Sequence, residues 1–203
     1  MISRIYLWVV IQLIVLFLIS YNVSADDAIS EKSKSDYKWF VSIYGGINVE
    51  ENLAKIVVPN ESISDSNYLL VGALAREIYR YKQWFSFEFE GLVGKHFGPK
   101  DDQWEFAGLI LGRWHTFPWD EYIDTSFAMG AGVSENSEIS SIELQRDENA
   151  QRLLGYLAFE FTFGLPQCPR WDLMLRVHHR SGAQGTIGES VTNYLCVGLK
   201  FSF

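Results

Sequence analysis

The strongest constraint on the fold of this chain is an alternation of apolar and polar side chains that recurs after residue 36. It is clearest in the segment 84–93, whose two faces are Phe85, Phe87, Phe89 and Val93 on one side and Ser86, Glu88 and Glu90 on the other. Successive side chains of a β-strand point to opposite faces, so this two-residue period predicts strands with one apolar face. Aromatic residues and glycines recur within such segments, a pattern that favours a β-barrel over a helical bundle.

Eight segments share this periodicity, and together they cover most of the chain after residue 36. They are approximately 38–48, 67–80, 83–95, 103–115, 121–134, 152–165, 170–181 and 191–203. No stretch within them approaches the roughly twenty consecutive apolar residues of a membrane-spanning helix, which excludes a helical multi-span protein.

The connections between these segments alternate in length. The longer ones, 49–66, 96–102, 135–151 and 182–190, take turns with short ones near 81–82, around Pro118 and at 166–169. Outer-membrane barrels have short periplasmic turns and longer external loops, so the alternation predicts a barrel with both termini in the periplasm. A closed barrel of eight strands also leaves no unpaired edge in the lipid.

Charged residues fall on the face opposite the apolar one. Those expected to point inward are Glu88, Glu90, Glu105, Arg113, Asp124, Glu160 and Arg176. They are too numerous for a dry apolar core, and they fit a narrow barrel filled by an ionic, hydrogen-bonded network. Such a barrel has no room for a wide pore, so the sequence argues against a general porin. A secreted β-sandwich is the soluble alternative, because its strands alternate too.

The first 25 residues have the pattern of a secretory signal. Arg4 provides the positive charge, an apolar run follows it over 5–19, and small residues precede Asp26. We expect cleavage near residue 25 and a polar, flexible segment over 26–36. An uncleaved membrane anchor is the alternative, because the apolar run is only slightly short for a spanning helix.

Net charge and cysteine content limit the possible partners. The formal net charge of −8 argues against nucleic acid, whose phosphates require a basic surface. Cys168 and Cys196 are the two cysteines, and a disulfide between them is possible in an oxidising compartment. No motif for a nucleotide, a metal or another cofactor is present, so we expect none.

The last segment carries a further mark of an outer-membrane protein. Its apolar face consists of Leu195, Val197, Leu199, Phe201 and Phe203. A terminal aromatic residue on an amphipathic last strand is typical of substrates of the outer-membrane assembly machinery. We therefore predict an all-β protein of a Gram-negative bacterium, an eight-stranded antiparallel outer-membrane β-barrel over residues 37–203.

The segment 170–181 contains a candidate catalytic pair of residues. His179 and Ser181 share the outward face, whereas His178 and Arg180 point inward. Residues two apart in a strand lie about 6–7 Å apart at their Cα atoms, within reach of a hydroxyl–imidazole hydrogen bond. Ten steps along a tilted strand from Trp171 advance roughly 25 Å, close to the height of the apolar band. The pair is therefore expected at the outer interface, where it would meet lipid head groups and acyl esters.

His179-Arg180-Ser181-Gly182, with the Gly-containing loop and amphipathic strand that follow, resembles the lipid A 3-O-deacylases of the PagL family. That family consists of small eight-stranded outer-membrane barrels. Its members use a His-x-Ser pair on the outer wall and a Glu on the neighbouring strand to hydrolyse the 3-linked acyl ester of lipid A. Length and strand count agree over 37–203, and the motif agrees within the last two segments.

The resemblance implies a role for each matching residue. Ser181 is the expected nucleophile, His179 its general base, and Glu189 the carboxylate that orients the imidazole. The family usually has Asn after the nucleophile, and here Gly182 stands in its place. The expected oxyanion donor is then the backbone N–H of Gly182 or the side chain of Asn193. Lipopolysaccharide in the outer membrane is the implied substrate.

Two other functions remain open from the sequence. A non-catalytic barrel would use its long loops, 49–66 and 135–151, for surface binding or for stabilising the envelope. A narrow channel is the third possibility. The remaining histidines offer no metal site from their spacing: His178 is expected to meet interior carboxylates, and His96 and His115 lie in separate hairpins.

Overall fold

The computed structural model describes residues 36–49, 63–99, 102–139, 141–146, 150–182 and 191–203. The predicted signal segment, 1–25, lies outside these residues, and so does nearly all of the predicted flexible segment 26–36. Their expected roles therefore stay predictions.

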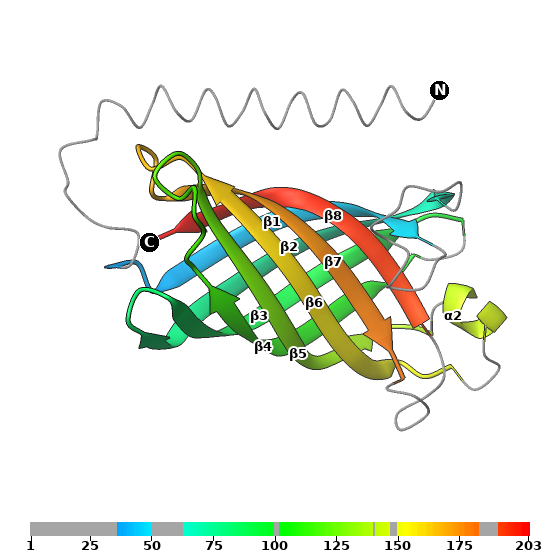
Figure 1. Cartoon of the computed structure of the whole chain (residues 1–203). Helices are drawn as coiled ribbons and strands as arrows, with labels where there is room; N and C mark the ends of the chain where they lie inside the picture. The colour runs from blue at the N-terminus through cyan, green and yellow to red at the C-terminus, as the bar shows by residue number, and fades with distance from the viewer. Residues whose placement is uncertain (1–35, 50–62, 100–101, 140, 147–149, 183–190) are drawn as a thin grey trace.

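The fold is a closed antiparallel barrel in which each strand pairs with its neighbours in the chain and β8 returns to β1 (Figure 1). The strands are β1 (Trp39–Val49), β2 (Ile63–Tyr81), β3 (Phe85–Phe97), β4 (Trp104–Trp114), β5 (Asp124–Asn136), β6 (Leu153–Gly164), β7 (Trp171–Ser181) and β8 (Val191–Ser202). All eight predicted strands are present. The closed ladder leaves no strand edge unpaired, as a sheet in hydrocarbon requires.

One element was not predicted from the sequence. A short helix, α2 (Ser141–Arg146), lies in the connection between β5 and β6, which was expected to be a plain loop. A helix of six residues is less than two turns long, which is too short for a helical period to be recognised in the sequence.

The two ends of the barrel differ in their connections. The start of β1 and the end of β8 lie together at one end, where the backbone N–H of Phe203 donates to the carbonyl of Trp39 at 2.9 Å. The connections 82–84, 115–123 and 165–170 share this turn end, and α2 lies at the opposite loop end (Figure 1). The connection 115–123 is longer than the sequence predicted, because β5 begins at Asp124. By the rule for outer-membrane barrels, the turn end is periplasmic and the loop end external.

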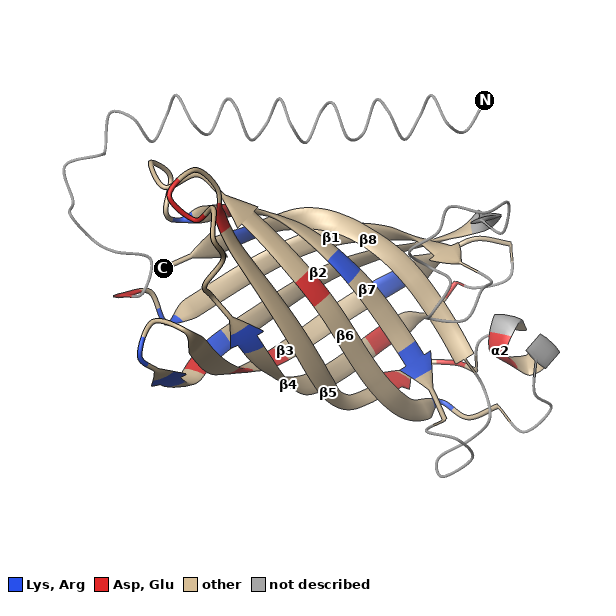
Figure 2. Ribbon diagram, in the orientation of Figure 1, with Lys and Arg blue, Asp and Glu red and all other residues tan. Residues whose placement is uncertain are grey.

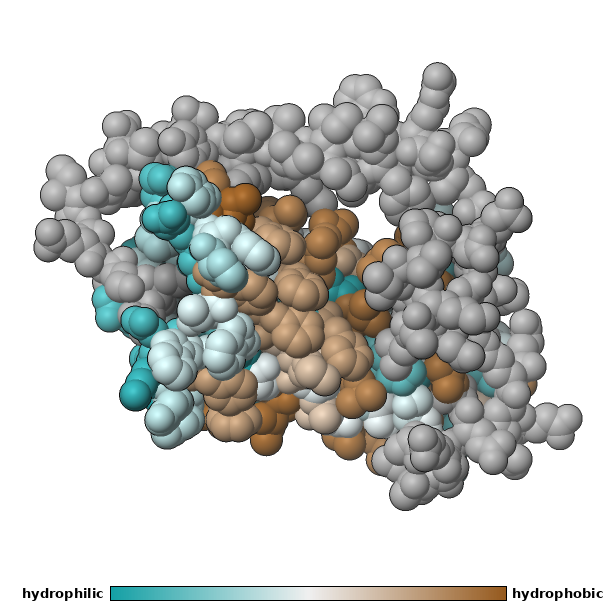
Figure 3. Space-filling view, viewed as in Figure 1, coloured by the Kyte–Doolittle hydropathy of each residue, from teal (hydrophilic) through white to brown (hydrophobic). Residues whose placement is uncertain are grey.

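The outer wall is apolar. Large exposed side chains on it include Ile43, Leu70, Leu74, Phe89, Phe106, Ile110, Met129, Val133 and Leu175. Figure 3 shows apolar residues over the middle of the visible wall and hydrophilic residues gathered toward the turn end. A wall of this polarity is the reverse of a water-soluble barrel and matches the lipid-facing band of an outer-membrane protein. Among the described residues, no helix has the length and apolar character needed to cross a bilayer.

Toward the turn end, the interior holds a charged layer, and acidic and basic positions occur well inside the span of the strands (Figure 2). Arg113 is its centre: Nε donates to Glu88 Oε1 at 2.7 Å and Nη2 to Glu160 Oε1 at 2.6 Å. Arg176 donates to Glu90 at 2.6 Å, and Lys200 lies 3.4 Å from Glu88. These three cations and three carboxylates balance in charge, and they confirm the predicted ionic interior.

A mostly apolar layer fills the middle of the barrel. Its buried members include Leu69, Val71, Leu92, Leu109, Leu111 and Met174, together with Tyr44, Tyr156 and Tyr194. These side chains pack against one another in one cluster, and on β4 its members Leu109 and Leu111 lie between Arg113 of the charged layer and the loop end. A filled interior of this kind is usual for eight strands, whose circumference is just wide enough for side chains to meet.

The two cysteines do not form a disulfide. Cys168 lies in the β6–β7 turn, whereas Cys196 lies in the middle of β8, opposite Arg176. Arg176 lies five steps along β7 from Trp171, roughly 17 Å, and a disulfide requires Cα atoms within about 7 Å. The disulfide that the sequence left open is therefore absent.

Candidate functional site

His179 and Asn193 form a polar pair on the outer wall near the loop end. They face each other in the β7–β8 register, and His179 Nδ1 lies 2.5 Å from Asn193 Oδ1. Only 6% of His179 is exposed, and Asn193 is fully buried. Because the amide oxygen can only accept, it holds the proton of the neutral imidazole on Nδ1 and leaves Nε2 as the basic nitrogen.

A second contact fixes Asn193 from behind. The side chain of Asn48, on the inward face of β1, donates from Nδ2 to the backbone carbonyl of Asn193 at 3.1 Å. Asn48 is itself buried, so this bond is shielded from water. The backbone that presents Asn193 to His179 is thus held by both neighbouring strands.

Ser181 lies two residues beyond His179 on the same outward face and is half-buried. Its register partners are Gly155 on β6 and Val191 on β8, so no large side chain stands beside it on the β6 side. Gly182 follows directly after β7 and is buried. Within the described residues, no hydrogen bond joins Ser181 to His179, and such bonds are often long before substrate is bound.

The sequence assigned the imidazole's partner to Glu189, and that residue lies outside the described residues. The residue found at the imidazole is Asn193, which had been considered as an oxyanion donor. The β7–β8 register decides this, because it sets Asn193 directly opposite His179. The structure therefore brings His179 together with Asn193, in place of the His and Glu pair expected from the sequence.

Arg180 lies between His179 and Ser181 and points into the barrel. Its guanidinium donates to Glu143 Oε1 at 2.7 Å and to Ser134 Oγ at 3.0 Å. Glu143 belongs to α2, so the helix in the external loop reaches into the mouth of the barrel with a fully buried carboxylate. No periodic signal in the sequence linked Glu143 to β7, because the contact spans 37 residues and depends on how the loop folds back.

A cluster of two histidines and Glu105, called here the histidine cluster, lies next to Arg180 in the barrel interior. Glu105 accepts from His96 Nε2 at 2.8 Å and from His178 Nε2 at 3.0 Å, and Ser134 donates to it at 2.6 Å. The prediction that His178 meets an interior carboxylate is confirmed. That His96 joins it was missed, because the two histidines come from distant hairpins.

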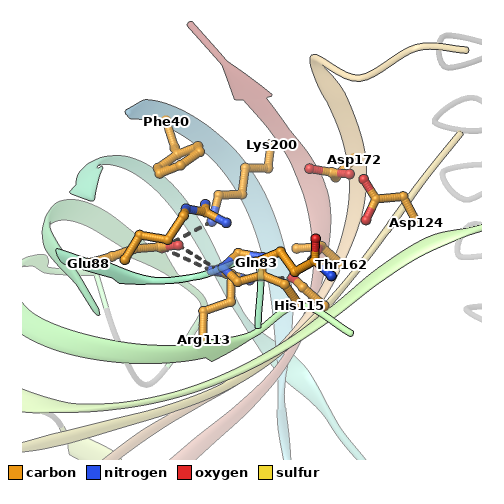
Figure 4. Close-up of a pocket in the computed structure, with 11 residues that line it drawn as sticks. Phe40, Gln83, Glu88, Arg113, His115, Asp124, Thr162, Asp172 and Lys200 are labelled. Atoms are coloured by element: carbon orange, nitrogen blue, oxygen red, sulfur yellow. Dashed lines mark hydrogen bonds and ion pairs between the residues drawn. The ribbon is translucent and has the colours of Figure 1, made fainter. Parts of the chain in front are cut away.

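A cavity of about 190 Å³ lies at the turn end of the barrel, against the charged layer (Figure 4). Glu88, Arg113, Lys200 and Asp172 contribute to its lining, together with Phe40 and His115. It is far along the barrel from His179, since β7 begins at this end and the pair lies at its other end. In the part of the chain that the structure describes, no group of three or more His, Cys, Asp or Glu side chains has metal-binding geometry.

Comparisons with known proteins identify the fold. No protein-family model matches the chain, and no curated protein sequence matches it. Solved structures do: the outer-membrane enzyme PagL is similar with a TM-score of 0.55 at 9% identity, covering 81% of this chain and 99% of PagL. A de novo designed transmembrane β-barrel has a TM-score of 0.51 at 11% identity and covers 86% and 100% of the two chains.

Neisserial surface protein A is similar to the same degree, with a TM-score of 0.51 at 9% identity over 81% of this chain and 96% of that protein. At such low identity the likeness concerns the fold alone. The apolar outer wall, the charged interior and these comparisons together make the chain an eight-stranded β-barrel of the outer membrane.

Proposed function

We propose that this barrel is an outer-membrane esterase that removes an ester-linked acyl chain, at the 3-O position, from the lipid A of lipopolysaccharide. The observation that carries the proposal is the 2.5 Å contact between His179 and Asn193, beside Ser181 on the lipid-facing wall. An imidazole held by a buried amide next to a hydroxyl is the arrangement of a nucleophile and its base.

The position of the pair favours a lipid substrate over a soluble one. Ser181 ends β7 at the loop end, roughly 25 Å along the barrel axis from Trp171. That height corresponds to the outer interface of the membrane, where the acyl esters of lipid A lie. Because the side chains of His179 and Ser181 point away from the interior, an ester carbonyl would approach them sideways from the bilayer.

The chemistry follows from the atoms available. Ser181 Oγ attacks the ester carbonyl carbon while His179 Nε2 takes the hydroxyl proton, and Asn193 Oδ1 holds the resulting imidazolium by its Nδ1–H. The bond from carbon to the sugar oxygen then breaks, the imidazolium returns its proton to that oxygen, and an acyl-enzyme remains. A water deprotonated by His179 releases the fatty acid and regenerates Ser181.

The donor for the negative oxygen of the tetrahedral intermediate is assigned to the backbone N–H of Gly182. It directly follows the nucleophile in the chain, the place from which a backbone donor can reach that oxygen. The side chain of Asn193, the other donor considered from the sequence, has its oxygen on His179, and we give it the orienting role instead. Lipopolysaccharide and the outer-membrane assembly machinery are the proposed partners.

The direct test uses the refolded mature barrel in vesicles that contain lipopolysaccharide. Mass spectrometry of lipid A should reveal the loss of one hydroxy fatty acid with the natural chain and none with Ser181→Ala. Ser202→Ala, the same change at the turn end of β8, is a control that leaves the site unchanged. Intact lipid A after incubation with a folded natural barrel would refute the proposal.

A non-catalytic surface protein is the second candidate. The observation that favours it is the partner of the imidazole: an amide carries no charge and stabilises an imidazolium less than the carboxylate expected from the sequence. This alternative predicts that Ser181→Ala leaves function unchanged and that exchanging the β5–β6 connection abolishes it.

A further inference from the structure

The loop end of β7, which carries His179 and Ser181, is anchored by the inward side chain of Arg180. His179 and Ser181 point to lipid, and the residue between them, Arg180, points inward and is 1% exposed. Whatever fixes the Arg180 side chain also fixes the backbone that carries both outward residues. Strand ends fray unless side chains hold them, so this anchor bears directly on the geometry of the pair.

Arg180 is held from three sides. Its Nε donates to Ser134 Oγ of β5 at 3.0 Å, its Nη2 to the carbonyl of Arg152 at 3.0 Å, and its Nη1 to Glu143 of α2 at 2.7 Å. Glu105 of β4 lies 3.7 Å from Nε and adds a second carboxylate. Of these groups, Glu143 alone comes from outside the barrel wall and its strand ends.

The same carboxylate oxygen also holds the neighbouring strand. Thr192 Oγ1 donates to Glu143 Oε1 at 3.0 Å, and Thr192 is the register partner of Arg180. Glu143 therefore bridges β7 and β8 at one level of the ladder. The adjacent level on one side is the pair His179 and Asn193, and on the other it is Ser181 and Val191.

We infer that Glu143 is a positioning residue for the proposed esterase, acting through Arg180 and Thr192 to hold His179, Ser181 and Asn193 in register on the opposite face of the sheet. The inference rests on the proposed function for its catalytic meaning, and on the contacts above for its structural meaning. A residue in the external loop thereby controls geometry on the lipid-facing wall without touching the substrate.

Substitution of Glu143 is expected to leave the barrel folded. Arg180 keeps Glu105 as a nearby carboxylate and keeps its bonds to Ser134 and to the Arg152 carbonyl. Glu143→Gln retains an acceptor without the charge, and Glu143→Ala removes both. Glu135→Gln is the matched control, because Glu135 is an exposed carboxylate near the same end whose ion pair with Arg152, at 3.3 Å, faces solvent.

The experiment measures two properties of the full mature barrel in bilayers. The first is amide hydrogen exchange at Arg180, Ser181, Thr192 and Asn193, and the second is covalent labelling of Ser181 by a fluorophosphonate probe. Glu143→Ala should speed exchange at these amides by about tenfold and slow labelling about ten- to hundredfold, since a misplacement near 1 Å has that effect. With a p-nitrophenyl ester, kcat should fall while KM stays unchanged. Glu143→Gln should give a smaller change, and Glu135→Gln none.

The outcomes separate the inference from the proposed function. Unchanged exchange at these amides in folded Glu143→Ala overturns the inference. Faster exchange with an unchanged labelling rate also overturns it, because the anchor then has no effect on Ser181. If the natural barrel is neither labelled nor active on lipid A, the esterase function fails, and the exchange data still decide whether Glu143 holds the strand pair.

Discussion

His179 and Asn193 face each other across β7 and β8, with Nδ1 and Oδ1 2.5 Å apart on the lipid-facing side of the barrel. The hydrogen bond fixes the imidazole tautomer with a neutral amide. A carboxylate at the same point would form a charge-assisted bond, which is roughly twice as strong.

Asn193→Asp should therefore raise the esterase rate of the barrel by about tenfold, equivalent to about 1.4 kcal/mol of transition-state stabilisation. Asn193→Leu, of similar size, should reduce the rate by at least as much, because the imidazole loses its orienting acceptor. Both effects are read from initial rates of fatty-acid release. A rate that is equal in all three proteins would remove Asn193 from the mechanism.

The charged layer should contribute strongly to stability. Arg113→Met leaves Glu88 and Glu160 buried without their central partner, and we expect the free energy of unfolding to fall by about 3–5 kcal/mol. Lys95→Met is the matched control, since Asp102, the partner of Lys95, is 79% exposed and such a pair contributes less than about 1 kcal/mol. Urea unfolding in lipid vesicles measures both. Equal losses for the two variants would contradict the ionic layer as a structural element.

Gly198 of β8 packs so closely against β1 that a side chain at this position would clash with the backbone. A Cβ at Gly198 would lie 2.3 Å from the backbone oxygen of Ile43 and 2.6 Å from the Cα of Tyr44, too close for any side chain. Gly198→Val is therefore expected to prevent closure of β8 on β1. Gly72→Val is the control, because a Cβ there has no atom within 4 Å. The different gel mobility of folded and unfolded barrels distinguishes the two, and a folded Gly198→Val would show that the strands separate easily.

The filled interior predicts that the barrel does not conduct ions. On β4, Leu109 and Leu111 lie between Arg113 of the charged layer and Glu105 of the histidine cluster, where a permeating ion would lose its hydration. Planar-bilayer recordings of the natural barrel should give no discrete current steps. Regular current steps of constant amplitude would support the hypothesis of a narrow channel, which the sequence left open.

The alternation of apolar and polar side chains predicted most of the fold but few of the contacts. Alternation alone put Glu88, Arg113 and Glu160 on the inner face, and all three are buried there. It could not show that Arg176 meets Glu90, 86 residues away, because partners across a barrel depend on strand tilt and register as well as on facing. The alternation can be read from a single strand, whereas pairing across the interior depends on the arrangement of several strands.

The candidate site shows the same division. The outward position of His179 and Ser181 follows from counting along one strand, whereas the partner of His179 depends on the register between two strands. Glu189 was expected because it is the acidic residue that follows Ser181 in the last hairpin, yet the β7–β8 register sets Asn193 opposite the imidazole. Glu143 was beyond prediction for a related reason, since it enters the barrel from a connection with no periodic signal.

The balanced layer of Arg113, Arg176 and Lys200 with Glu88, Glu90 and Glu160 also constrains how the protein reaches its membrane. These six groups come from β3, β4, β6, β7 and β8, and only the β6–β7 hairpin carries a neutral set, Glu160 with Arg176. The β3–β4 hairpin has two carboxylates and one cation, and Lys200 of β8 has its carboxylates on β3 and β6. The β3–β4 hairpin or β8 inserted by itself would expose lone charges to hydrocarbon, at a cost of several kcal/mol for each. Biogenesis must therefore assemble these strands together, so that the charges meet before lipid surrounds them.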